Sequence, residues 1–261
     1  MPDRLLALIS ENFPLYALLL VRVGGLVFLM PVLGSRLVPV RIKAAATMVM
    51  ALALLPAART LPAPSLNSPA EIILNVFFEF LLGVTLGLVL RLVFAGVQLA
   101  GQMIGFQIGF GVASVIDPQT GVESLILSQL AYLVSLLIFL AIDGHHLVLK
   151  ALGDSLQILP LGAFRPDRQV VEVLLREAQV MFILSIKIVA PVMTVLFLVQ
   201  VALGVISKIV PQMNVMIVSF PLTIAIGLAF FALSLEAMAP MLEKAFGGVW
   251  RVIPVILRSQ G

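Results

Sequence analysis

The residues of this chain that could do chemistry are few, and most of them stand inside or beside long apolar runs. Six are ionisable: Arg22, Glu79, Arg91, Lys187, Lys208 and Glu236. Such charges are costly in lipid, so each should meet a partner or water. They could line a translocation path, or they could pair between subunits and snorkel at helix ends. Glu79 and Lys187 lie deepest in their runs and are the better candidates for buried ion pairing.

A second polar group, Asp143-Gly144-His145-His146, follows an apolar run. Neighbouring residues on a helix point about 100° apart, so adjacent histidines make a poor metal pair. The sequence therefore predicts a turn here, and neither a metal site nor another cofactor. The sequence contains no His-Glu-x-x-His, Gly-x-Ser-x-Gly or Gly-x-x-x-x-Gly-Lys signature and no cysteine nucleophile, so we do not expect an enzyme.

The composition is that of a membrane protein. Hydrophobic residues make up 61% of the chain and charged residues only 11%, whereas soluble domains carry about 25% charged residues. The mean hydropathy is +1.18. The basic residues that give the net charge of +3 are scattered, which argues against a nucleic-acid partner. An all-α, polytopic helical membrane protein with broken helices is the predicted fold class.

The elements of this fold are marked by apolar runs. A membrane-spanning helix needs roughly 20 such residues. A single domain over residues 1–261 is expected to contain all of these elements. Proline-rich loops should cover residues 56–69 and 160–168, and an amphipathic helix should cover residues 169–177. The six predicted hydrophobic segments are residues 13–33, 44–55, 72–95, 125–142, 180–206 and 215–238.

Between the third and fourth segments lies a stretch, residues 96–121, that is dense in glycine and glutamine. Gly101, Gly105 and Gly109 recur every four residues and so form one ridge of a helix. A bare ridge allows a neighbouring backbone to approach closely. Glutamine is costly against hydrocarbon, so this stretch should face protein or a water-filled lumen.

Two helix breaks interrupt the apolar sequence. Pro118 disfavours helical geometry at Asp117, and Pro211-Gln212-Met213-Asn214 separates the fifth and sixth segments. Non-helical backbone at membrane depth is tolerated only when protein buries it or when it lines a cavity. Two breaks therefore indicate a transporter-like core or a subunit embedded in a larger assembly.

Three stretches taken in order, residues 96–121, 139–145 and 211–215, resemble the FliR/SctT family of type III secretion export-gate subunits. The Asp143-Gly144-His145 turn is more similar to the flagellar branch of that family than to the injectisome branch. The resemblance implies assembly with FliP- and FliQ-type membrane subunits into a helical hetero-oligomeric pore complex. It also implies contact with FlhB- and FlhA-type proteins and passage of unfolded export substrates.

In that family the glycine-rich stretch forms a plug that seals the pore. The resemblance places the plug or gate of this chain at Gly105, Phe106, Gln107, Ile108, Gly109, Phe110 and Gly111. From the residues alone, Phe106 and Phe110 suit core packing as well as a hydrophobic constriction.

The resulting hypothesis is a subunit of the flagellar export gate in the bacterial inner membrane, within the flagellar basal body. The alternatives are an injectisome gate subunit of the same architecture and, from another class, a stand-alone secondary transporter. The sequence does not show paired broken segments in two equivalent halves, and this is an argument against the transporter.

Overall fold

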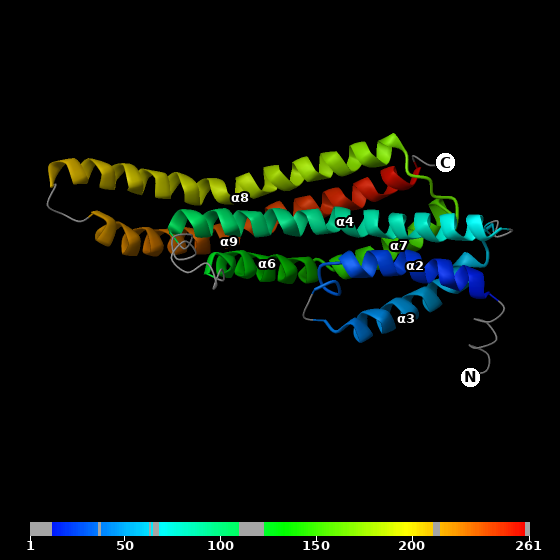
Figure 1. Cartoon of the computed structure of the whole chain (residues 1–261). Coiled ribbons are helices and arrows are strands. Elements are labelled where there is room, and N and C mark those ends of the chain that lie inside the picture. Colours follow the sequence, from blue (N-terminus) through cyan, green and yellow to red (C-terminus); the bar gives the residue numbers. More distant parts are fainter. Residues whose placement is uncertain are drawn as a thin grey trace. The chain divides into compact units, whose positions relative to one another are not determined.

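The computed structural model describes residues 12–35, 38–62, 64, 68–109, 123–210 and 215–258 (Figure 1). Within these ranges all regular secondary structure is helical, which confirms the predicted all-α class. The helices are α2 (Phe13–Leu29), α3 (Val40–Ala58), α4 (Pro69–Ile108), α6 (Glu123–Ala141), α7 (Gly144–Ile158), α8 (Arg168–Ile209) and α9 (Val215–Arg258).

Each of the six apolar runs falls on a helix, but the helix ends differ from those of the runs. Helix α2 ends at Leu29 because Pro31 follows Met30, whose ψ of 128° is extended; a residue before proline is driven out of the helical region in this way. Helix α4 continues for 40 residues, so the first half of the glycine-rich stretch is helical. The amphipathic stretch 169–177 is the beginning of α8, not a separate helix.

Helix α7 lies outside the six predicted segments. It is 15 residues long and carries Lys150 and Asp154 among its apolar side chains. Its length and mixed composition therefore fall below what a hydropathy window detects. The loop expected over residues 160–168 is present up to Asp167, where α8 is about to begin.

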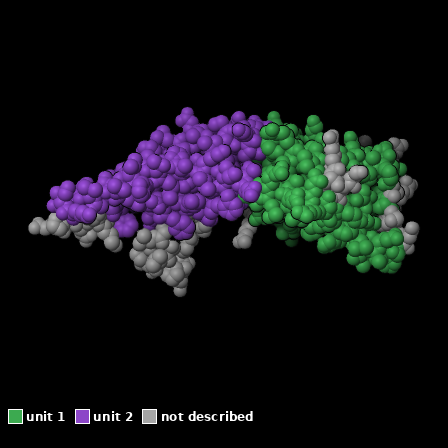
Figure 2. Space-filling view, turned by 90° about the horizontal axis from the view of Figure 1, so that it is seen from above, with its two compact units in different colours: residues 1–92, 143–178, 246–261 green, residues 93–142, 179–245 purple. Residues whose placement is uncertain are grey.

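The chain separates into two compact units (Figure 2). Unit 1 comprises residues 1–92, 143–178 and 246–261, and unit 2 comprises residues 93–142 and 179–245. Helices α4, α8 and α9 each contribute residues to both units. A single domain over the whole chain stays a prediction.

In unit 1, helices α2 and α4 pack backbone against backbone. A Cβ atom added to Gly25 would lie 2.8 Å from the carbonyl oxygen of Phe80, and one added to Gly83 would overlap the carbonyl of Arg22. Only glycine permits such an approach. The core of α2 that results contains Leu19, Val23 and other side chains with almost no exposed surface.

In unit 2, the second half of α4 supplies a continuous buried stripe. It begins with the adjacent residues Val93 and Phe94 and continues at intervals of three to four residues with Val97, Ala100, Ile104 and Ile108. This spacing keeps the stripe on one helix face. The Phe94 ring lies 5.7 Å from that of Tyr132 and 5.6 Å from that of Phe139, both on α6. The stripe therefore attaches α4 to α6 within this unit.

Four helices of the described chain are long and apolar enough to cross a membrane. They are α3, α4, α8 and the part of α9 from Ile217 to Leu257. The bent pair α6 and α7 makes a fifth if it counts as one span. Length and composition thus agree with the predicted polytopic membrane protein.

The close approach at Gly83 generates a stability prediction. Gly83→Ala should lower the apparent melting temperature of the purified protein in detergent, because the new methyl group must push α2 away from α4. Overpacking of this kind costs about 1–3 kcal/mol.

Gly153→Ala on α7 is the matched control, since a Cβ there has no neighbour within 4 Å. It should leave the melting temperature unchanged or raise it, because alanine favours a helix over glycine by about 0.5–1 kcal/mol. Equal effects of the two substitutions would contradict the close approach.

Candidate functional site

One member of the predicted glycine ridge, Gly101, meets the backbone of a neighbouring helix. A Cβ on Gly101 would lie 2.6 Å from Cα of Ser128 on α6, and one on Gly96 would lie 2.8 Å from the carbonyl oxygen of Met181 on α8. Gly105 is buried as well. The structure therefore confirms close helix packing at Gly101, and α4 is held between two helices of unit 2.

Helix α4 ends where the candidate plug begins. Gly109 has φ +110°, a conformation that L side chains rarely adopt. Ile108, just before it, is fully buried, and its side chain occupies the space that a Cβ on Gly227 of α9 would take. Oγ1 of Thr223 on α9 lies 3.3 Å from the carbonyl oxygen of Ile108, and it lies closer, at 2.9 and 3.1 Å, to carbonyl oxygens of its own helix. The last turn of α4 is thus anchored to α9.

Phe106, two residues before Ile108, differs from it in exposure. Phe106 is 59% exposed, whereas Ile108 has no exposed surface. Gln107 is half-buried. Of the predicted plug, Gly105 to Gly109 are placed in this way; Phe110 and Gly111 lie outside the described residues, as do the helix-break residues Asp117, Pro118, Pro211, Gln212 and Asn214.

A buried ion pair in unit 1 is the most elaborate polar arrangement of the described residues. Arg22 of α2 and Glu79 of α4 have fully buried side chains, with Nε of the arginine 2.5 Å from Oε2 and Nη2 3.0 Å from Oε1. This is the bidentate geometry in which a guanidinium binds a carboxylate most strongly.

The same pair also binds the segment that follows α7. Both terminal nitrogens of Arg22 donate to the carbonyl oxygen of Leu159, at 3.1 and 3.2 Å, and Nη1 lies 3.4 Å from Oγ of Ser155. The backbone N–H of Gly162 donates to Oε1 of Glu79 at 2.7 Å. Gly162 has φ +79°, which favours glycine at this turn. The network therefore joins α2, α4 and the end of α7.

The two candidates for buried ion pairing, Glu79 and Lys187, lie in different surroundings. Glu79 forms a buried ion pair, and its partner is Arg22. Lys187 is exposed on α8, while its neighbours Ser185 and Ile188 are buried. A helix rotates by 100° per residue, so depth along an apolar run does not tell which way a side chain points.

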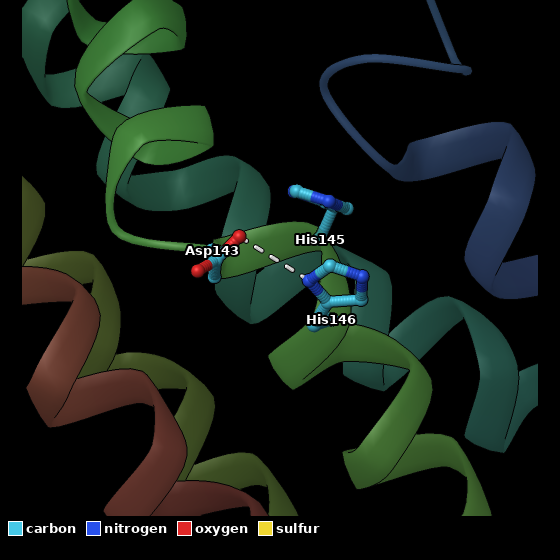
Figure 3. A group of neighbouring side chains, drawn as sticks. All are labelled: Asp143, His145 and His146. Carbon is cyan, nitrogen blue, oxygen red and sulfur yellow. Dashed lines mark hydrogen bonds and ion pairs between the residues drawn. The ribbon is translucent and has the colours of Figure 1, made fainter.

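The polar group between α6 and α7 forms a turn, as expected. Asp143 has φ 55° and ψ 30°, and Gly144 is the first residue of α7. The Asp143 carboxylate and Nδ1 of His146 are 3.3 Å apart, and the two imidazole centroids are 4.1 Å apart (Figure 3). Adjacent histidines are thus closer together than ideal helical spacing suggested.

Two contacts between distant residues could not be found by reasoning from the sequence. Arg22 was recognised as a charge in an apolar run, but nothing in the sequence connected it to Glu79, 57 positions away. Thr223 gave only the weak signal of a hydroxyl within an apolar stretch, and its contact with α4 depends on packing.

The comparisons with known proteins address the family. Residues 13–249 match the sequence profile of the family described as bacterial export proteins, family 1. This chain belongs to that export protein family. The flagellar biosynthetic protein FliR of Bacillus subtilis is 33% identical over 91% of this chain and 92% of its own length. FliR of Escherichia coli is 28% identical over 93% of this chain and 92% of its own length.

A third relative matches a smaller part of this export-family chain. The surface presentation of antigens protein SpaR of Shigella flexneri is 37% identical, but only over 46% of this chain and 45% of its own length. The ion pair, the end of α4 and the Asp143 turn all fall inside the range that the family profile covers.

The buried ion pair generates a second stability prediction. Glu79→Gln should strongly destabilise this export-family protein, because the Arg22 charge is left buried without its counterion; loss of one partner of a buried pair costs about 3–5 kcal/mol. The apparent melting temperature in detergent measures this loss.

The double variant Arg22→Met/Glu79→Leu is the control. It distinguishes the cost of an unpaired buried charge from the cost of altered packing. It should regain part of the stability, since neither charge remains buried. Recovery should be incomplete, because the N–H of Gly162 loses its acceptor. A double variant no more stable than Glu79→Gln would show that unpaired charge is not the cause.

Proposed function

We propose that the chain is a membrane subunit of the flagellar type III protein export gate, forming part of the pore through which unfolded proteins cross the inner membrane. One observation carries this proposal: the similarity to two flagellar FliR proteins extends over more than nine-tenths of the chain. The proposed location is the flagellar basal body. The chain itself would act as a conduit and not as an enzyme.

The surfaces of two helices in unit 2 support a role in an assembly. Phe197 and Leu198 of α8 are 60% and 61% exposed, and Ile217 of α9 is 69% exposed. Apolar side chains on this scale require lipid or another protein against them. A gate subunit surrounded by unlike membrane proteins meets that requirement.

The flagellar branch is favoured over the injectisome branch by coverage. The match to SpaR is limited to less than half of the chain, whereas the matches to the FliR proteins of Bacillus subtilis and Escherichia coli span more than nine-tenths of it. A stand-alone transporter is the weaker alternative. The described glycines of α4 approach neighbouring helix backbones at Gly96 and Gly101, which suits tight packing better than a substrate pocket.

The proposed partners are FliP- and FliQ-type membrane subunits, with FlhB- and FlhA-type export proteins in contact with the complex. Export substrates would pass through as unfolded chains, and other components would supply the energy. Neither nucleic acid nor a bound cofactor has a part in this proposal.

Within the gate, residues 105–111 are proposed to form the seal. The different burial of Ile108 and Phe106 supports different roles for these two residues. Ile108 is fully buried and packs against Gly227 of α9, whereas Phe106 is 59% exposed. The anchor would hold the end of α4 in place while Phe106 contributes apolar surface to a hydrophobic constriction.

Co-purification tests the proposed assembly. A tagged chain extracted from native membranes in mild detergent should retain two small, unlike membrane proteins in a stable complex, identified by mass spectrometry. Membranes that contain the untagged chain control for carry-over. Recovery of the chain alone, or only with copies of itself, would favour the transporter.

Ion leakage tests the proposed seal. Phe106→Ala should increase conductance through the assembled gate in planar bilayers severalfold, because a smaller side chain widens an apolar constriction and lets it hydrate. Phe182→Ala is the matched control, since Phe182 is 55% exposed on α8 and lies outside the proposed seal. Equal conductance of both variants and the unmodified gate would overturn the assignment of Phe106.

A further inference from the structure

We infer that the turn between α6 and α7 binds a divalent transition metal ion through Asp143, His145 and His146. Each of the three side chains offers one ligand atom, and these atoms lie within 4.8 Å of one another. Two imidazoles and one carboxylate form a donor set that suits Zn²⁺ and its neighbours in the first transition row. The inference is independent of the proposed export role.

The distance between two of the ligand atoms already fits a metal. Nδ1 of His146 and Oδ1 of Asp143 are 3.3 Å apart. Tetrahedral ligands at metal–ligand distances of about 2.0–2.1 Å are separated by roughly 3.3–3.4 Å. A cation can therefore bind both atoms when the neutral imidazole of His146 carries its single proton on Nε2, because Nδ1 is then free to act as a ligand.

The carboxylate of Asp143 contacts His146 and does not cap the helix that it precedes. Aspartate before a helix commonly accepts a hydrogen bond from a backbone N–H of the first turn. Asp143 is the N-terminal capping residue of α7, yet its side chain makes no such bond. Its oxygen faces His146 instead, as the dashed line in Figure 3 shows.

The backbone at Asp143 is also unusual. It is the one described non-glycine residue with positive φ, at 55°. Non-glycine residues adopt a left-handed conformation rarely, aspartate and asparagine more often than most, and residues held in it concentrate at functional sites. Here the conformation brings the carboxylate and the first-turn imidazoles to the same place.

His145 supplies an independent indication. Its Nδ1 is buried and has no hydrogen-bond partner among the described residues. Buried polar atoms are nearly always satisfied, and an exception calls for an explanation such as a bound ion. The ring centroid lies 4.1 Å from that of His146, and one ring nitrogen lies within 4.8 Å of the other two ligand atoms.

Binding of a cation beside the N-terminus of α7 requires the negative charge of the Asp143 carboxylate. Helix N-termini carry partial positive charge and repel a cation. Asp143 is the only acidic member of the cluster, and it provides the compensating negative charge. Three protein ligands leave further coordination positions for water or for a group from another molecule.

Zn²⁺ binding to the purified full-length protein, isolated in its complex with a tag that contains no histidine, tests this inference. Titration against a fluorescent zinc chelator measures the affinity, and elemental analysis after dialysis measures the stoichiometry. We expect one saturable Zn²⁺ per chain. Co²⁺ in its place should give the strong visible absorption of a tetrahedral site.

Asp143→Asn and His146→Gln should each weaken binding at least tenfold, since even loss of a hydrogen-bond partner of a metal ligand costs about 10–100-fold. Both side chains are largely exposed, at 72% and 68%, and asparagine tolerates the left-handed conformation, so these variants should fold. Asp154→Asn, an exposed position on α7, is the control and should bind normally. No saturable binding, or equal binding by all four proteins, would overturn the inference.

Discussion

The bidentate pair between Arg22 and Glu79 is the constraint on which unit 1 depends. Two charges taken fully out of water are costly, and only near-ideal geometry with further hydrogen bonds offsets that cost. The structure provides both, through the carbonyl oxygen of Leu159 and the N–H of Gly162. Apolar packing alone would allow these helices to slide or rotate; satisfying this pair permits one arrangement of α2, α4 and the end of α7.

The glycines of unit 1 belong to the same constraint. Gly25 stands three residues after Arg22 and Gly83 four residues after Glu79, so each glycine shares a helix face with one member of the ion pair. Their missing side chains let the backbones of α2 and α4 come together. Close backbones exclude water from the pair, and exclusion of water strengthens the attraction between the charges. The positions of the glycines therefore strengthen the ion pair, because the close approach that they permit keeps it dry.

Hydropathy alone predicted the fold class and the location of six helices, because long apolar runs have no other stable form in a membrane. The ends of the helices were harder to predict. Helix α4 runs on through its glycines since Ser128 and its neighbours stabilise that stretch by packing, which no local signal reveals. Helix α7 was missed because its composition is mixed.

Side-chain direction limited the prediction of sites in the same way. Glu79 and Lys187 are equivalent in the sequence, each a charge deep in an apolar run. One faces the core of its unit and the other faces outward, according to the rotation of its helix. The turn at Asp143 was predicted, but the proximity of the two adjacent imidazoles was not, since it depends on side-chain rotamers that the sequence does not reveal.

Hydropathy and burial diverge among the long helices, and this divergence argues for an assembly. Helices α4 and α8 have nearly equal mean hydropathies of 2.3 and 2.4 over their most apolar stretches, yet 61% of that stretch is buried within the chain in α4 and only 33% in α8. In α9 the buried share falls to 22%. Apolar character beyond what the chain's own core uses must meet lipid or other proteins. The end of α4 needs no such surroundings, because Ile108 packs against Gly227 of α9 within the chain itself. Helices α8 and α9 therefore depend most on an apolar environment that the chain does not supply, and a membrane that also holds the proposed partner subunits would supply it.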